Sequence, residues 1–199
     1  MKKQIIMMTL AVAATGLWAK ASDTNDSKLR VNPTESKVEW LGKKVTGEHT
    51  GHIDISSGEL IIDGGKLSGG TFVIDMSSIT NTDIEKSDMN EKLVGHLKSD
   101  DFFAVEKYPT SKLVITQVTH EKGSKYQVKG NITIKGITKP IDFPAEVSLA
   151  GDKAFASAVI TIDRSEFDVK YGSGSFFDGL GDKMIYDDFT LNVSLVAGQ

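Results

Sequence analysis

The sequence predicts an all-β protein, an antiparallel β-barrel of about eight strands with one short helix and a lid loop. Most segments after residue 36 alternate apolar and polar residues with a period of two, as strands with one buried face do. Turn clusters rich in Gly and Asp separate these segments, which is typical of hairpins. Charged residues occupy the face opposite the apolar one, so the apolar face is expected to turn inward.

The N-terminus has the features of a secretory signal peptide, with cleavage expected after Ala21. Lys2-Lys3 precede an apolar run from Ile5 to Trp18, and Ala19-Lys20-Ala21 fits the A-x-A cleavage pattern. The apolar run is shorter than the roughly 20 residues that a membrane-spanning helix needs. We therefore expect a periplasmic or secreted protein with a signal peptide at 1–21, a flexible polar leader at 22–35 and a single β-barrel domain at 36–199.

Charge and composition exclude several classes of protein. Residues 1–21 contain three lysines and no acidic residue, so 20 basic and 27 acidic residues remain after cleavage, a net charge near −7. Nucleic acid is therefore not an expected partner. The chain has no cysteine, which excludes disulfides, thiolate metal sites, a cysteine nucleophile and the lipid-modified cysteine of a lipoprotein.

Eight segments show the alternation of half-buried strands. The turn clusters Asp63-Gly64-Gly65, Lys122-Gly123-Ser124 and Gly151-Asp152 separate some of them and predict hairpins. The inward positions are expected to be Val38/Trp40, Ile53/Ile55, Phe72/Ile74/Met76, Leu113/Ile115, Val128/Gly130/Ile132/Ile134, Ile141/Phe143/Ala145/Val147/Leu149, Ala156/Ala158/Ile160/Ile162 and Leu191/Val193/Leu195.

The outer face of these strands distinguishes a soluble barrel from a transmembrane one. Charged residues lie on the face opposite the apolar one, namely Lys37, Glu39, Lys129, Lys135, Asp142 and Glu146. A Lys or Arg facing lipid at mid-bilayer would cost about 2–4 kcal/mol. The sequence therefore favours the soluble form, with its apolar face inside.

One stretch follows a helical rather than a strand pattern. Met89, Leu93 and Leu97 fall four residues apart, and Ser87 is expected to act as the N-cap, which predicts a helix over 87–98. The following Asp100-Asp101-Phe102-Phe103 ends in two adjacent aromatic residues that favour burial. Helix and loop together are expected to form a lid on one end of the barrel.

The interior of such a barrel can be filled by side chains or can hold one small ligand, as in lipocalin-like barrels. The expected inward set mixes large and small side chains, and the small ones could leave an elongated void. Interdigitation into a filled core is the alternative, and both stay open at this point. The large residues are Trp40, Phe72, Phe143 and Phe155, and the small ones are Gly130, Ala145, Ala156 and Ala158.

Five motifs along the chain resemble those of the YceI-like family of periplasmic polyisoprenoid-binding proteins, over nearly the whole sequence after the signal peptide. In order, they are Trp40-x-Gly42-Lys43 with Gly47-x-His49-x-Gly51, Gly69-Gly70-x-Phe72-x-Ile74-Asp75-Met76, His96-Leu97-Lys98-Ser99-Asp100-Asp101-Phe102-Phe103 with Tyr108-Pro109, Gly130-Asn131-Ile132-Thr133-Ile134-Lys135-Gly136-Ile137-Thr138-Lys139, and Arg164-Ser165-x-Phe167 with Tyr171-Gly172.

The resemblance implies an extended lipocalin-like barrel whose tunnel accepts a long isoprenoid chain, such as a quinone tail or a polyprenyl phosphate. We interpret the chain as an exported carrier of such a lipid, neither an enzyme nor dependent on a cofactor or metal, with transient membrane contact and a homodimer as further options. The expected ligand-binding residues are Trp40, Phe72, Ile74, Phe102, Phe103, Leu113, Ile115, Ile132, Ile134, Phe143, Val147, Ile160, Arg164 and Phe176.

Two cations are candidates for an anionic head group. Arg164 offers a planar fork to phosphate, and Lys170 lies close in sequence. The alternative is that Arg164 pairs with Asp75 or another acid and closes the barrel end. The segment from Gly172 to Gly181 is expected to be a mobile loop at the barrel mouth, where its aromatic residues, including Phe176, could cover a ligand.

The remaining polar residues match no diagnostic site. His49 and His52 lie three apart and so face opposite sides of a strand, and no third ligand has metal-binding spacing. We expect His49 and His96 to form hydrogen bonds at the rim or lid. Ser173 and Ser175 do not satisfy G-x-S-x-G. Two other functions remain open: an enzyme of unknown reaction that uses the same cavity, and a stress-related structural or interaction protein with a filled barrel.

Overall fold

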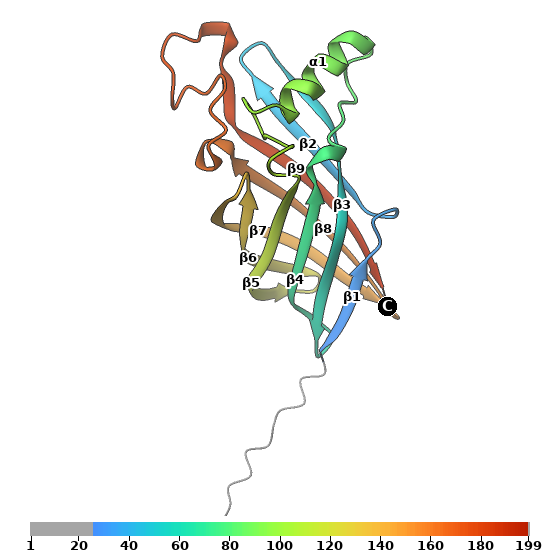
Figure 1. The fold of residues 1–199 in the computed structure, drawn as a ribbon. Helices are drawn as coiled ribbons and strands as arrows, with labels where there is room; N and C mark the ends of the chain where they lie inside the picture. Colours follow the sequence, from blue (N-terminus) through green and yellow to red (C-terminus); the bar gives the residue numbers. More distant parts are fainter. Residues whose placement is uncertain (1–25, 199) are drawn as a thin grey trace, which may run out of the picture.

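The computed structural model describes residues 26–198, so the expected signal peptide at 1–21 lies outside the described residues. Its strands form one antiparallel sheet that closes on itself (Figure 1). Within the described residues, no helix has the length and hydropathy needed to cross a lipid bilayer. The strands are β1 Ser27–Val31, β2 Lys37–Lys44, β3 Gly47–Asp63, β4 Lys66–Asp75, β5 Thr110–Lys122, β6 Lys125–Ile134, β7 Ile137–Ala150, β8 Lys153–Asp163 and β9 Ile185–Gly198. The helices are α1 Ser87–Lys98 and the 3-10 turns η1 Met76–Ser78, η2 Arg164–Phe167 and η3 Gly181–Lys183.

The barrel has eight strand positions in the order β3-β2-β9-β8-β7-β6-β5-β4, and pairing of β4 with β3 closes the ring. Strands β1 and β2 both lie between β3 and β9, and each pairs with both of these strands. They do so at opposite ends of the barrel and so occupy one strand position. The predicted antiparallel barrel of about eight strands is therefore confirmed. The eight predicted segments correspond to β2 through β9.

The expected flexible leader at 22–35 is too long. Residues 27–31 form β1, in which Leu29 and Val31 are 5% and 7% exposed. Their side chains pack into the core because the alternation of apolar and polar residues begins there rather than at residue 36. The barrel domain thus begins at Ser27.

Tight two-residue turns connect most neighbouring strands, as the Gly-rich clusters predict. Gly64 and Gly65 join β3 to β4 with φ of +54° and +76°, values that L residues with a side chain rarely adopt. The same left-handed geometry occurs at Lys135 and Gly136 between β6 and β7, a hairpin that the sequence pattern did not single out.

Helix α1 has the predicted bounds, but it begins differently and is less buried than expected. Lys86 occupies the N-cap position, and the Ser87 hydroxyl donates to Glu91 instead of capping the helix. No residue of α1 is buried, and Met89 is 51% exposed. The helix therefore stands over the barrel end without sealing it, and Leu97 is its contact with the core.

The segment at residues 79–84, here called the strap, lies along the edge of β3 beyond the end of its pairing with β4. The Thr80 and Thr82 amides donate to the carbonyls of His52 and Thr50, and the Trp40 indole donates to the Thr80 carbonyl at 3.0 Å. A Cβ on Gly51 would lie 1.8 Å from that same carbonyl oxygen. Glycine at position 51 thus permits the strap to pass across the barrel end that carries α1, which we call the mouth end (Figure 1).

Candidate ligand-binding site

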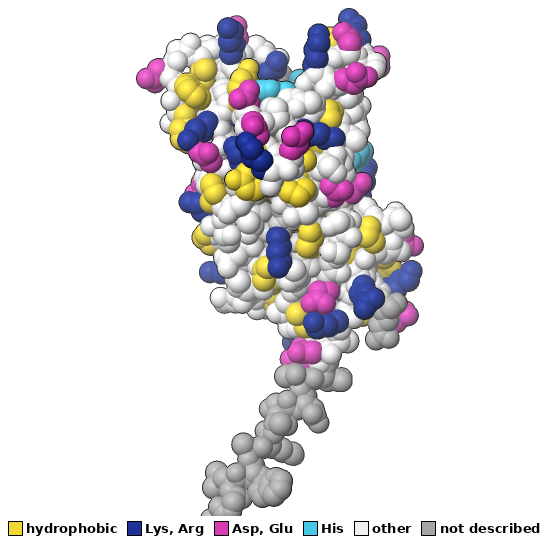
Figure 2. All heavy atoms as spheres, viewed as in Figure 1, with side chains coloured by type: hydrophobic (Ala, Val, Ile, Leu, Met, Phe, Trp, Pro, Cys, Tyr) yellow, Lys and Arg dark blue, Asp and Glu magenta, His cyan; other side chains and the backbone are white. Residues whose placement is uncertain are grey.

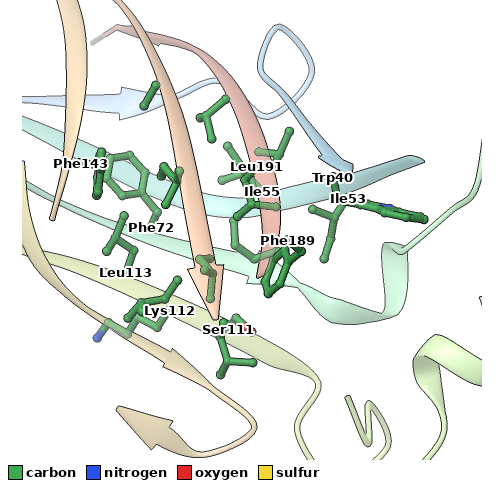
Figure 3. A pocket seen from close by; sticks show the side chains of 18 of the residues that line it. Trp40, Ile53, Ile55, Phe72, Ser111, Lys112, Leu113, Phe143, Phe189 and Leu191 are labelled. Carbon is green, nitrogen blue, oxygen red and sulfur yellow. The ribbon is translucent and has the colours of Figure 1, made fainter. Parts of the chain in front are cut away.

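An apolar cavity of about 210 Å³ occupies the barrel interior. Figure 3 shows that its wall is built from side chains of several strands that point toward one another, among them Phe72, Leu113, Phe143, Phe189 and Leu191. Thirteen of the fourteen predicted ligand-binding residues lie on this wall: Trp40, Phe72, Ile74, Phe102, Phe103, Leu113, Ile115, Ile132, Ile134, Phe143, Val147, Ile160 and Arg164.

Small side chains keep the interior from filling. Ala145 of β7, Ala158 of β8 and Val193 of β9 are register neighbours that all line the cavity. They are only half-buried although they point inward, because the surface that they expose faces the cavity. Outward neighbours such as Val159 are 58% exposed. The structure therefore has an open interior rather than the filled core that the sequence left as an alternative.

The end of the barrel opposite the mouth is closed by apolar packing. Tyr126, Ala154 and Ala197 are 5%, 0% and 1% exposed there, and they lie outside the cavity wall. Leu29 and Val31 of β1 belong to the same buried cluster. A ligand that occupies the cavity would thus reach it from the mouth end.

The loop at residues 99–109, here called the lid loop, lies at the mouth end as predicted. Phe102 is 6% exposed, Phe103 is half-buried, and both rings contact the cavity. The His96 ring packs edge-on against Phe102 and Tyr171, with centroids 5.7 and 4.4 Å away. The expected hydrogen bond of His96 is thus wrong, since its ring belongs to an aromatic cluster and its Nε2 has no partner among the described residues.

Asp83 fastens the strap to β3. Its carboxylate accepts hydrogen bonds from the Thr50 amide at 2.8 Å and from Asn81 Nδ2 at 2.5 Å, and it lies 2.8 Å from His49 Nδ1. Partial burial opposes ionisation, but the bonds from Thr50, His49 and Asn81 outweigh it and hold the pKa of Asp83 below its ordinary value. The expected hydrogen-bonding role of His49 at the rim is confirmed.

His52 faces away from His49, as the strand period predicts. Its Nε2 lies 3.4 Å from Glu39 on the outer face. Among the residues that the structure describes, no three His, Cys, Asp or Glu side chains lie together as a metal site would require.

Arg164 is buried at the mouth end and serves the fold. Its Nε donates to the Tyr186 carbonyl, Nη1 to the Val169 carbonyl and Nη2 to the Ile185 carbonyl, at 3.2, 2.7 and 3.0 Å. Nη2 also lies 3.3 Å from Asp187, and the guanidinium carbon lies 5.4 Å from the centre of the Phe102 ring. Burial lowers the pKa of Arg164, and the nearby carboxylate of Asp187 opposes this effect.

The alternative expectation for Arg164, that it pairs with Asp75 or another acid, is confirmed with Asp187 as that acid. The side chain of Asp75 instead accepts hydrogen bonds from the Ser77 amide and hydroxyl. The expected head-group role is not supported by the geometry of Arg164. The residue is 2% exposed, and its N–H groups already donate to three backbone carbonyls, so few donors remain for a phosphate. Lys170 pairs with Asp168 at 2.5 Å.

One aromatic residue, Phe155, was assigned wrongly to the interior, and Phe176, expected to cover a ligand at the mouth, does not line the cavity. Phe155 is 43% exposed because it alternates with Ala154 and Ala156 and so faces outward. Phe176 is also 43% exposed and is absent from the cavity wall, and the Lys170 ammonium lies 5.3 Å from the centre of its ring.

Ser173 is fully buried and shapes a turn, since its Oγ accepts from the Ser175 amide.

The structure also brings to the wall residues that were not assigned to the site, among them Ile79, Ser111 and Phe189. Ser111 and Phe189 lie two residues before the predicted inward positions Leu113 and Leu191. Extending the same alternation by one step would have found both. Ile79 belongs to the strap, and nothing in the local pattern points it inward.

Residues 29–197 match the family model described as the YceI-like domain. A UPF0312 protein of Vibrio parahaemolyticus is 28% identical over 189 residues, covering 89% of this chain and 95% of that protein. One of Photorhabdus laumondii is 48% identical over 52 residues, which is 26% of this chain and 27% of that protein.

Solved structures share the barrel. BcnA of Burkholderia cenocepacia has a TM-score of 0.67 at 26% identity, covering 84% of this chain and 99% of that one. A polyisoprenoid binding domain from Saccharophagus degradans has a TM-score of 0.63 at 15% identity, covering 85% of this chain and 97% of that one. Because the family model spans all nine strands in whole or in part, this chain belongs to the YceI-like domain family.

Proposed function

We propose that this protein is a lipid carrier that holds a long apolar isoprenoid-type molecule, a polyprenyl chain or an isoprenoid quinone, in its barrel. The observation that carries the proposal is the apolar cavity, which is open inside a barrel whose far end is closed. The family match and the fold shared with a polyisoprenoid binding domain support the choice of ligand class.

The size and lining of the cavity suit a thin hydrocarbon chain. At about 30 Å³ per group, 210 Å³ holds about seven groups the size of water or methylene, which corresponds to about one to two isoprene units. Each buried methylene contributes about 0.8 kcal/mol. A preformed cavity keeps the ordering cost of binding low, so a few isoprene units are enough for useful affinity.

We further propose that the protein works in the periplasm or outside the cell and touches membranes transiently at its mouth end. The N-terminal sequence pattern supports export. Phe176 and Phe177 are 43% and 49% exposed in the segment before β9. Figure 2 shows hydrophobic side chains gathered at the upper left, where Figure 1 draws that segment, close to where a lipid would leave a bilayer for the cavity.

Titration with isoprenoid alcohols of increasing length tests the proposed ligand class. Once residues 1–21 are removed, Trp40 is the only tryptophan and lies on the cavity wall, so its fluorescence reports occupancy. We expect affinity to rise at least about tenfold for each added isoprene unit up to about two units, and then to level off. Affinity that does not depend on chain length, or no binding at any length, would contradict the proposal.

A further inference from the structure

The cavity wall contains a buried hydroxyl that lacks a strong hydrogen-bond partner. Ser111, the second residue of β5, is 6% exposed and faces the interior among the side chains that Figure 3 shows. Its Oγ makes one side-chain contact, with Met76 Sδ at 3.0 Å. A thioether sulfur is only a weak acceptor, so the hydroxyl keeps unused capacity both to donate and to accept.

The surroundings of Ser111 make this hydroxyl conspicuous. Its register neighbour on β4 is Ile74, and the cavity wall around it is apolar. A hydroxyl in such a place is unfavourable unless it finds a partner, whereas an alanine at the same position would not require one. The serine therefore has a cost to the empty protein that a bound ligand can offset.

Other polar residues around the cavity are not available to a ligand. Five polar residues that border it are exposed to solvent: Lys43, Lys112, Ser157, Tyr186 and Asp188. Arg164 directs its donors to three backbone carbonyls. Among the described residues of the wall, Ser111 is thus the polar group best placed to bind the ligand.

We propose that Ser111 is a hydrogen-bonding subsite for an oxygen of the ligand, either a carbonyl, an ether or a hydroxyl. This inference rests on the proposed lipid-carrier function and adds the polar group of the lipid and its orientation. Ser111 lies at the mouth end, because β5 begins there and the Met76 amide bonds to the Pro109 carbonyl just before it. The apolar tail therefore enters first, and the oxygenated end stays beside Ser111.

Two probes of equal length separate this subsite from general apolar binding, namely farnesylacetone, which carries a ketone, and the matching hydrocarbon without oxygen. In Ser111→Ala, we expect the affinity for the ketone to fall about tenfold and the affinity for the hydrocarbon to stay unchanged. The infrared carbonyl band of bound ketone should shift to lower wavenumber in the wild type and not in the variant.

Ser157→Ala is the matched control, since this serine lies outward on β8 and should change neither affinity. Ser111→Val tests whether the hydroxyl rather than its volume matters, and it should behave like Ser111→Ala. Equal ketone affinity in wild type and Ser111→Ala, with no shift of the band, would overturn the subsite. If wild-type protein binds neither probe, the lipid-carrier proposal itself fails.

Discussion

Replacing Ala158 by phenylalanine is expected to abolish lipid binding while the barrel remains folded. Ala158 points into the cavity between Ala145 and Val193, so a phenyl ring there occupies the space that the lipid needs. Excluding even four methylenes removes about 3 kcal/mol of binding free energy, which lowers the affinity about 100-fold or more. Trp40 fluorescence titration with a three-unit isoprenoid alcohol measures this loss.

Val159→Phe is the matched control because this neighbouring residue faces outward and is 58% exposed. It should bind lipid as the wild type does. Thermal unfolding shows whether Ala158→Phe is folded, and filling an empty apolar space should leave its Tm unchanged or raise it. Wild-type affinity in a folded Ala158→Phe protein would mean that the lipid binds elsewhere.

Removing the side chain of Arg164 is expected to destabilise the protein by about 3–5 kcal/mol, the range for breaking a buried ion pair. Arg164→Ala leaves the carbonyls of Val169, Ile185 and Tyr186 without their donor and Asp187 without its buried cation. These groups join η2 to the start of β9, so the mouth end should loosen first. Urea unfolding of the chain without residues 1–21 measures the free energy of unfolding.

Lys170→Ala provides the comparison, since the ion pair of Lys170 with Asp168 is exposed and should contribute no more than about 1 kcal/mol. Arg164→Lys should recover only part of the loss, because one ammonium cannot donate in all the directions that the guanidinium serves. An Arg164→Ala protein as stable as Lys170→Ala would show that Arg164 does not hold the mouth end together.

Periodicity was enough to predict β2 through β9 because each strand has one face toward the interior and one toward solvent. The five-residue strand β1 was not predicted, because only Leu29 and Val31 mark its apolar face within an otherwise polar segment. Register shifts between Ile55 and Ser57 and between Ile115 and Gln117 were not predicted either. A bulge adds one residue to one strand, and alternation read along a single strand does not reveal its partner.

The candidate site was predictable where strands form it and not where loops do. Ten of the thirteen predicted residues on the cavity wall lie there because strand alternation alone sets their direction, and Phe102 and Phe103 lie there because adjacent aromatics favour burial. Arg164 pairs with Asp187, which follows a loop. The local sequence pattern does not predict the course of that loop, so it could not predict this partner. The distance of Phe176 from the cavity wall depends on the same loop.

The composition of the strands also could not predict whether the barrel interior is open or filled by side chains. The same mixture of residues fills a core if large side chains lie next to small ones on neighbouring strands. It leaves space if small side chains lie next to one another. Here Ala145 and Ala158 are direct neighbours and Ala156 lies next along β8, so the small side chains gather on one part of the wall. Cross-strand register, rather than the content of any strand, therefore creates the cavity.

Native mass spectrometry of protein purified gently from the cells that produce it is the most direct test of the proposed lipid-carrier function. Denaturing extraction then identifies whatever the protein releases. We expect one isoprenoid lipid per chain, with an oxygen-containing end group, and we expect Ala158→Phe prepared in the same way to be empty. A wild-type protein that emerges empty and takes up no added isoprenoid would contradict the function proposed for the cavity.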